Sequence, residues 1–230
     1  MIETILRQTK KPDKIILWLS EEQFQSKNDL PKNLLILQKR GLTIELRSGD
    51  FRSHKKYFYT LREYPNDIMI TVDDDIFYPT DMIRNLIQQS KKYPKCVIAN
   101  YTRIISYNEN QISPYIQWEY NYYKINIEHL FFGSGGGTLF PPNSLPTDAT
   151  NSDIFMSICP TADDIWLNAM CKCAGFNIRT TTLRSKLILP VLNQNNERLF
   201  TINSQSQNDI QIAAVTNYCK KKFGQNPFTP

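Results

Sequence analysis

Short apolar runs alternate with helical patterns through the first hundred residues of this 230-residue chain. The strand candidates are residues 14–19, 42–46, 68–72 and 96–101, and the helix candidates are residues 1–9, 32–40, 54–63 and 82–93. Elements that alternate in this way form an open sheet with helices on both faces. The sequence therefore predicts an α/β fold whose mixed, mostly parallel sheet is flanked by helices.

Three consecutive carboxylates, Asp73, Asp74 and Asp75, end the apolar run 68–72. Like charges this close raise one another's pKa and cost stability unless a cation neutralises them. Mg²⁺ prefers oxygen ligands and often keeps substrate phosphates in its remaining positions, and ligands of α/β proteins bind beyond the carboxyl ends of the strands. The triplet thus suggests a divalent-metal site. The alternatives are a solvated turn, or an aspartate that caps the next helix, a role that Asp81 could equally fill.

A second acidic pair, Asp163 and Asp164, begins a predicted helix that runs to Ala174 and is ended by Gly175. Carboxylates at a helix N-terminus interact favourably with the helix dipole, so capping is the simplest interpretation of this pair. Another helix is expected over about 209–222, after a polar loop over 193–208.

The segment 133–137 (GSGGG) contains neither a dinucleotide-binding nor a P-loop fingerprint. Adjacent glycines, including Gly135 and Gly136, allow the backbone to approach a ligand closely. A plain turn between two strands is the alternative. The preceding residues 102–132 are polar and aromatic.

Charge and cysteine content limit the classes of partner. With 27 Lys and Arg against 22 Asp and Glu, the net charge of +5 suits an anionic small-molecule substrate but is too weak to indicate nucleic acid. Five cysteines without a regular framework or zinc spacing indicate reduced thiols in a cytoplasmic protein. No apolar stretch approaches the ~18 residues of a membrane span, and the N-terminus lacks the layout of a signal peptide.

The order of these pieces resembles GT-A glycosyltransferases of the family 2 type. Residues 2–9 (IETILRQT) and the strand after them are similar to the first helix and second strand of those enzymes, and residues 71–75 (TVDDD) look like their D-x-D segment. Residues 133–139 resemble their glycine-containing loop, and 162–164 (ADD) resemble their x-E-D motif with Asp in place of Glu. The resemblance covers most of residues 1–180.

This resemblance implies a single GT-A, Rossmann-like domain. Residues 1–101 would form the nucleotide-sugar-binding half, residues 102–192 the acceptor-binding half, and residues 193–230 a polar loop with a C-terminal helix. Family members usually begin with a strand ahead of the first helix, and that strand helps to bind the nucleotide base. This chain starts at the helix, so either its N-terminus is shortened or its sheet is completed in another way.

The implied activity is that of an inverting, hexosyltransferase-type enzyme. It would move a sugar from a nucleotide-diphosphate donor, with a UDP-sugar as the first candidate, to a glycan or lipid-linked acceptor in surface polysaccharide biosynthesis. Mn²⁺ or Mg²⁺ would bridge the donor phosphates. Asp75 would be the direct metal ligand, Asp73 would lie near the metal or the donor ribose, and Asp74 would be their neighbour. Asp164 would act as the general base with support from Asp163.

Further site residues are expected from their position in the chain. Lys55 and Lys56 could pair with the phosphate or base of the donor, although a solvated helix start is the alternative. Trp166 could stack on an acceptor sugar, together with Gly135 and Gly136 on the acceptor side, while core packing is the default for a tryptophan. All these roles require the two acidic clusters to converge on a single cleft.

Two other function classes remain open. The four aspartates Asp73, Asp75, Asp163 and Asp164 could build a two-metal phosphohydrolase or nuclease site, although the chain has only two histidines and no marked basic groove. A non-catalytic GT-A module that binds a glycan or a partner is the other candidate. The expected location is the cytoplasm, with weak peripheral contact at the inner membrane face through the lysines at 220–222.

Overall fold

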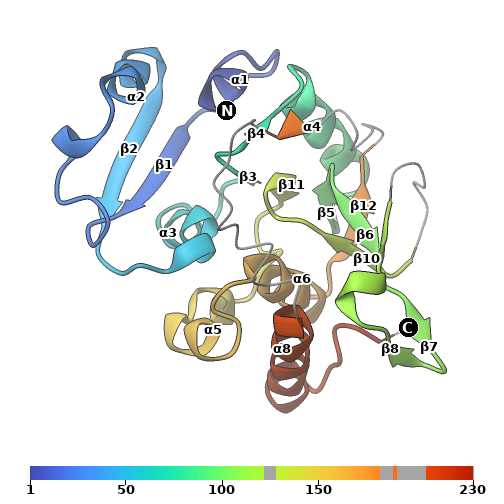
Figure 1. The fold of residues 1–230 in the computed structure, drawn as a ribbon. Coiled ribbons are helices and arrows are strands. Elements are labelled where there is room, and N and C mark those ends of the chain that lie inside the picture. The colour runs from blue at the N-terminus through green and yellow to red at the C-terminus, as the bar shows by residue number, and fades with distance from the viewer. Residues whose placement is uncertain (122–127, 182–188, 191–205, 230) are drawn as a thin grey trace.

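A computed structural model describes residues 1–121, 128–181, 189–190 and 206–229 (Figure 1). The helices are α1 (Ile2–Leu6), α2 (Lys32–Ile36), α3 (Lys55–Glu63), α4 (Met82–Lys92), α5 (Ser152–Ile158), α6 (Asp163–Cys173) and α8 (Asn208–Phe223). The strands are β1 (Ile15–Ser20), β2 (Leu42–Arg47), β3 (Met69–Val72), β4 (Ile76–Phe77), β5 (Cys96–Ala99), β6 (Thr102–Ile104), β7 (Tyr107–Asn108), β8 (Gln111–Ile112), β9 (Glu119–Tyr120), β10 (Leu130–Phe132), β11 (Gly136–Phe140), β12 (Asn177–Thr180) and β13 (Leu189–Pro190).

The predicted alternation of helix and strand in the first hundred residues is confirmed. Each of α1, α2, α3 and α4 is followed by a strand, namely β1, β2, β3 and β5. The second of these helices tightens into a 3₁₀ turn that ends at Gly41, whose φ of 104° lies in the left-handed region. Glycine adopts that conformation without strain, so the chain can turn there directly into β2. The helix expected from Asp163 and the helix expected over about 209–222 are present as α6 and α8. The predicted loop over 193–208 lies mostly outside the described residues.

Helices cover both faces of the central sheet. Alternate side chains of β5 point to opposite faces, as in any strand: Val97 and Ala99 pack in a large aromatic core with α6, whereas Cys96 and Ile98 pack in a second core with α4. Because both faces are buried, β5 reads as a continuous apolar run. The structure is therefore a mixed α/β fold, as the sequence predicted.

The expectation of a mostly parallel sheet is wrong. The central sheet has the strand order β12-β5-β11-β3, in which β12 is parallel to β5 while β11 is antiparallel to both β5 and β3. Among the eight strand pairings of the described residues, only β1–β2 and β5–β12 are parallel. The chain leaves β5, passes through the small sheet β10-β6-β9, and returns as β11 in the opposite direction. A strand buried on both faces looks the same in sequence whichever way it runs, so the sequence could not indicate this reversal.

The parallel pair β1–β2 forms a separate sheet, which stands apart from β3 in Figure 1. Trp18 of β1 donates its indole N–H to Thr60 Oγ1 of α3 at 2.8 Å, and the start of α3 contacts the residue that follows β3. Both strands therefore lie against the same helix. In the described residues, the edge of β1 away from β2 and the edge of β3 away from β11 have no strand partner, and residues of both strands line one cleft.

No helix in the described part of the chain is both long enough and apolar enough to cross a bilayer.

Candidate functional site

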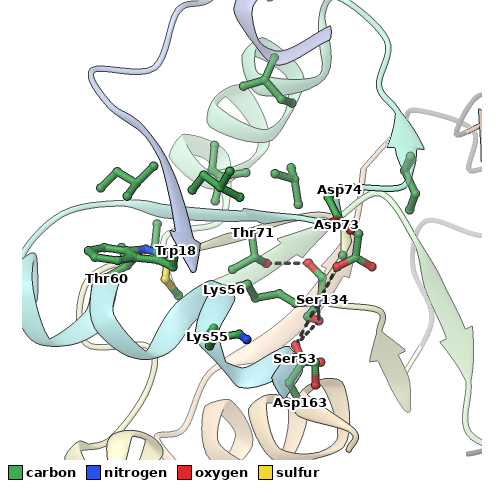
Figure 2. A pocket seen from close by; sticks show the side chains of 18 of the residues that line it. Trp18, Ser53, Lys55, Lys56, Thr60, Thr71, Asp73, Asp74, Ser134 and Asp163 are labelled. Carbon is green, nitrogen blue, oxygen red and sulfur yellow. Dashed lines mark hydrogen bonds and ion pairs between the residues drawn. The ribbon is translucent and has the colours of Figure 1, made fainter. Parts of the chain in front are cut away.

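The two acidic clusters, which are far apart in the sequence, meet through one lysine. The side chain of Lys56, in the first turn of α3, places Nζ 2.5 Å from Asp73 Oδ1 and 3.3 Å from Asp163 Oδ2. Asp73 follows β3 directly, and Asp163 is the first residue of α6. Figure 2 shows the lysine lying between the two carboxylates. The convergence that the predicted site required is therefore present in the structure.

Ser134 is a further member of this site that sequence reasoning missed. Its hydroxyl donates to Asp163 Oδ2 at 2.6 Å and accepts from Lys56 Nζ at 3.3 Å, while its carbonyl accepts from Thr71 Oγ1 at 2.6 Å (Figure 2). The serine thus joins the glycine-containing loop to both acidic clusters. The sequence did contain a signal for this residue, because Ser134 is the one polar side chain within a run of glycines. It is therefore the one side chain of that run that can form a hydrogen bond.

Two glycines of the loop are needed for close packing. A Cβ on Gly135 would lie 1.7 Å from Asp73 Oδ2, and a Cβ on Gly136 would lie 2.4 Å from Tyr101 Cβ. Real Cβ atoms do not approach other heavy atoms this closely, so any side chain here would displace its neighbour. The structure shows these glycines packed against Asp73 and Tyr101, and their close approach to a ligand on the acceptor side stays a prediction.

Tyr78 fixes the turn that carries the aspartate triplet. Its hydroxyl accepts the backbone N–H of Asp73 at 2.8 Å and donates to the carbonyl of Gly135 at 2.5 Å. The side chain is buried, so both bonds form away from competing water. This tyrosine therefore links the end of β3 to the glycine loop.

The members of the second acidic pair ionise differently. Burial raises the pKa of Asp164 to about 7, and the adjacent charge of Asp163 adds to the effect. Burial also acts on Asp163, but there Lys56 and the bond from Ser134 outweigh it and lower the pKa. Near neutral pH, Asp163 is a fixed anion and Asp164 can take up a proton. An acid whose pKa is close to the working pH is well suited to general acid–base chemistry.

The charge on Lys56 is held in place by its partners. Burial disfavours the ammonium form, but the carboxylates of Asp163 and Asp73 outweigh that effect and raise the lysine pKa above its ordinary value. A buried cation that is ion-paired with two carboxylates is much less costly than an unpaired one. The lysine is therefore a cation at neutral pH.

Lys55 does not join this centre. Its ammonium bonds Asp50 Oδ1 at 2.6 Å and Gln23 Oε1 at 3.0 Å. Neighbouring residues on a helix point about 100° apart, so two adjacent lysines reach different groups. Both line the cleft, but Lys56 alone of the two bridges the acidic clusters.

The remaining aspartates of the triplet sit at the wall of the cleft. Asp74 is exposed and Asp75 is half-buried, and both line the cleft together with Asp73. Asp164 also lines this cleft and is half-buried. The side chains assigned to metal binding and to proton transfer thus border one space.

The interpretation of Trp166 as a sugar-stacking residue is wrong. Its side chain is 0% exposed and its indole N–H donates to the carbonyl of Ala149 at 3.0 Å. The residue points from α6 into the aromatic core and presents no face to a ligand. Only its position next to the acidic pair suggested a site role, and adjacent helix residues face different ways.

The oxygen donors present suit a divalent cation that is shared with a substrate. The described residues contain no group of three or more His, Cys, Asp or Glu side chains placed to hold a metal ion. Mg²⁺ at phosphate-binding sites commonly uses only one or two carboxylates plus phosphate oxygens and water. Asp75 and Asp73 could supply such carboxylates at the cleft wall, so the donor set fits Mg²⁺ or Mn²⁺ completed by a diphosphate.

The cleft has a volume of about 1650 Å³ and runs between β1, β3 and α3 to the start of α6. It is larger than the roughly 300–1,000 Å³ of typical small-molecule pockets, so it has room for a large ligand or for two smaller ones. The amino-acid sequence matches no protein-family model and no curated protein. Geometry and chemistry of the site therefore carry the functional inference.

Proposed function

We propose that this protein is a metal-dependent, inverting glycosyltransferase that moves a sugar from a nucleotide-diphosphate donor to an acceptor hydroxyl. The observation that carries the proposal is the ion-paired centre of Lys56, Asp73 and Asp163, with distances of 2.5 Å and 3.3 Å from the lysine Nζ to the two carboxylates. It places the strand-end aspartates and an aspartate with a pKa of about 7 around one cleft.

Asp164 is the proton acceptor in this proposal. As the acceptor oxygen forms its bond to the anomeric carbon, the bond from that carbon to the donor phosphate breaks and its electron pair leaves with the nucleoside diphosphate. The acceptor proton passes to Asp164. A carboxylate positioned to accept this proton speeds the reaction typically ~10²–10⁴-fold. Attack from the face opposite the leaving group inverts the anomeric configuration.

Asp163 and Lys56 position this base. Lys56 and Ser134 hold Asp163 as an anion. The negative charge of Asp163 raises the pKa of the neighbouring Asp164 further. Asp75 and Asp73 would hold Mn²⁺ or Mg²⁺, which when bound supplies positive charge to the departing diphosphate. The donor phosphates therefore belong at the end of β3 and the acceptor hydroxyl near the start of α6.

A GT-A-like organisation of the domain is part of this proposal, and the helices on both faces of the central sheet are the feature that supports it. A UDP-sugar is the first donor to test, and the proposed acceptor is a glycan or lipid-linked sugar of a surface polysaccharide. The proposed site of action is the cytoplasm, at or near the inner face of the membrane. The proposed acceptor-binding half includes the aromatic residues between β5 and β11.

Donor binding is the first test. UDP-, GDP- and CDP-sugars are added to the purified protein with and without Mn²⁺, and the melting temperature is recorded. A ligand at a hundred times its Kd stabilises the native state by about 2.7 kcal/mol, which corresponds to roughly 5–10 °C for a chain of this size. We expect such a rise for a UDP-sugar with Mn²⁺. No shift with any of the nucleotide sugars would contradict the proposal.

Turnover in variants is the second test. Asp164→Asn should lower kcat by about 10²-fold or more, and Asp75→Asn should raise the Mn²⁺ concentration needed for activity. Asp153→Asn is the matched control, because Asp153 is exposed in the first turn of α5. If both site variants turn over donor like the control, the assigned roles are wrong. Cleavage of phosphoesters without any acceptor would instead favour a phosphohydrolase.

A further inference from the structure

Arg103 is a buried cation in the wall of the cleft. It lies in β6, where its backbone pairs with Tyr120 of β9 and Phe131 of β10, and its residue is only 3% exposed. It nevertheless lines the same cleft as Asp164 and the glycine loop. An arginine this deeply buried normally has a carboxylate partner.

No carboxylate of the described residues pairs with this guanidinium. Nη2 donates to Tyr120 Oη at 2.7 Å, the side chain also hydrogen-bonds the hydroxyl of Tyr101, and Nη1 approaches the carbonyls of Tyr115 and Trp118, each at 3.5 Å. Nε is buried and has no hydrogen-bond partner among the described residues. The rings of Tyr120 and Tyr115 cover the guanidinium at 4.2 Å and 4.7 Å. Aromatic rings attract a cation, but by less than a buried carboxylate does.

The guanidinium lies on the side of the glycine loop that is away from Asp73. Gly135 packs against Asp73, whereas Gly136 packs against Tyr101, which is two residues before Arg103 in the chain. Tyr115, whose ring covers Arg103, has its pKa raised first by burial and then by the charge of Asp164. Arg103 therefore shares Tyr115 as a neighbour with the proposed proton acceptor, and it lies on the Tyr101 side of the glycine loop instead of the Asp73 side.

We propose that Arg103 binds a carboxylate on the acceptor, so that the acceptor is an acidic sugar. The planar fork of N–H groups in arginine matches the two oxygens of a carboxylate. A single guanidinium also balances a single negative charge, because the other cation described near the acidic centre, Lys56, is already paired with two aspartates. The idea rests on the proposed function only in assigning the bound sugar as the acceptor.

The test compares two sugars that differ in one group. Methyl β-glucuronide carries the carboxylate, and methyl β-glucoside has a hydroxymethyl group in its place. Binding of each to the full chain is measured by isothermal titration calorimetry without any nucleotide sugar. We expect the glucuronide to bind at least about tenfold more tightly, as a charge-assisted bidentate contact allows. In Arg103→Gln, that preference should disappear.

Two further variants keep the test decisive. Arg84→Gln removes the same charge from an exposed helix position outside the cleft and should keep the tenfold preference. Arg103→Lys keeps the positive charge without the planar fork of N–H groups, so it should retain only part of the preference for the glucuronide. This variant replaces Arg103→Gln in the test if Arg103→Gln does not fold. Equal affinities of the wild type for the two sugars would overturn the proposal, as would a preference that survives in Arg103→Gln. Tighter binding of methyl phosphate than of the glucuronide would also overturn it.

The outcome is separable from that of the proposed transferase activity. The calorimetric comparison needs neither donor nor turnover, so a failed donor screen leaves its result intact. Conversely, the protein could bind a nucleotide-sugar donor and yet bind the glucuronide and the glucoside equally tightly. That result would leave the transferase proposal standing and would contradict only the proposal of an acidic acceptor.

Discussion

At the scale of single residues, Lys56 decides how the site is assembled. One ammonium group pairs with Asp73 at the end of β3 and with Asp163 at the start of α6. Removing it would leave two carboxylates facing one another with no cation between them. The adjacent Lys55 has the same length and charge but pairs with one carboxylate, Asp50, which is 37% exposed, whereas Asp163 beside Lys56 is 8% exposed; it therefore offers an internal comparison.

Lys56→Met should destabilise the fold much more than Lys55→Met. Breaking a buried ion pair by removing one partner typically costs about 3 kcal/mol or more, whereas an ion pair with an exposed partner contributes about 0–1 kcal/mol. Urea unfolding of the two variants measures the difference. Equal midpoints would show that the bridge between the acidic clusters contributes little to stability.

At the scale of elements, the glycine loop and β11 join the proposed donor side of the site to the proposed acceptor side. The register of β11 against β3 shifts between Gly136 and Thr138. This irregularity directly follows Gly135, which packs against Asp73. Such an irregularity bends a strand locally and re-aims what precedes it. The position of Asp73 therefore depends on the loop as much as on its own strand.

Gly135→Ala tests that dependence. The added Cβ would fall 1.7 Å from Asp73 Oδ2, so the carboxylate must leave its place beside Lys56. We expect donor turnover to fall by at least tenfold, while overpacking destabilises the fold by about 1–3 kcal/mol. Gly224→Ala is the control, because nothing lies within 4 Å of its Cβ position and its φ of 68° imposes only the usual backbone strain. A Gly135→Ala enzyme as active as this control would contradict the expectation.

The open edges of β1 and β3 make a second prediction at this scale. Successive N–H groups of a strand point to opposite edges, so alternate amides of β1 face the cleft instead of β2. Hydrogen exchange measured residue by residue should give an alternating pattern in β1, fast at the cleft edge and slow at the β2 edge. Uniformly slow exchange along β1 would mean that the cleft edge is covered by another segment.

At the scale of the whole molecule, stability and activity should respond to pH in opposite ways. The folded-state pKa of Asp164 is about 7, whereas an unfolded aspartate titrates near 3.9. Between about pH 4 and pH 7 the native state therefore binds more protons than the unfolded state, and the contribution of Asp164 to stability falls as the pH rises. Above about pH 7 this loss levels off.

Comparing wild type with Asp164→Asn isolates this contribution. The stability of the wild type relative to the variant should fall from pH 4 to pH 7, as measured by urea unfolding at several pH values. Over the same range kcat of the wild type should rise towards a plateau above about pH 7, because the base must be unprotonated to act. Parallel pH–stability curves for the two proteins would show that Asp164 titrates like an ordinary exposed carboxylate.

Local pattern was enough to predict several features of this protein. The alternation of helix and strand and the end of α6 just before Gly175 follow from residue spacing and from glycine, which depend only on neighbours in the chain. The acidic clusters were visible for the same reason. The assignment of Trp166 failed because a helix residue next to a site can still point into the core.

Tertiary structure alone decided what these pieces do together. The direction of β11, the bridge from Lys56 to two distant aspartates and the separate ionisation of Asp163 and Asp164 all depend on groups that are far apart in the sequence. Burial and pairing in three dimensions set the charge of a side chain, and no local pattern records them. The amino-acid sequence thus supplied the chemical groups. Folding determined which of them share one cleft and which of them are protonated near neutral pH.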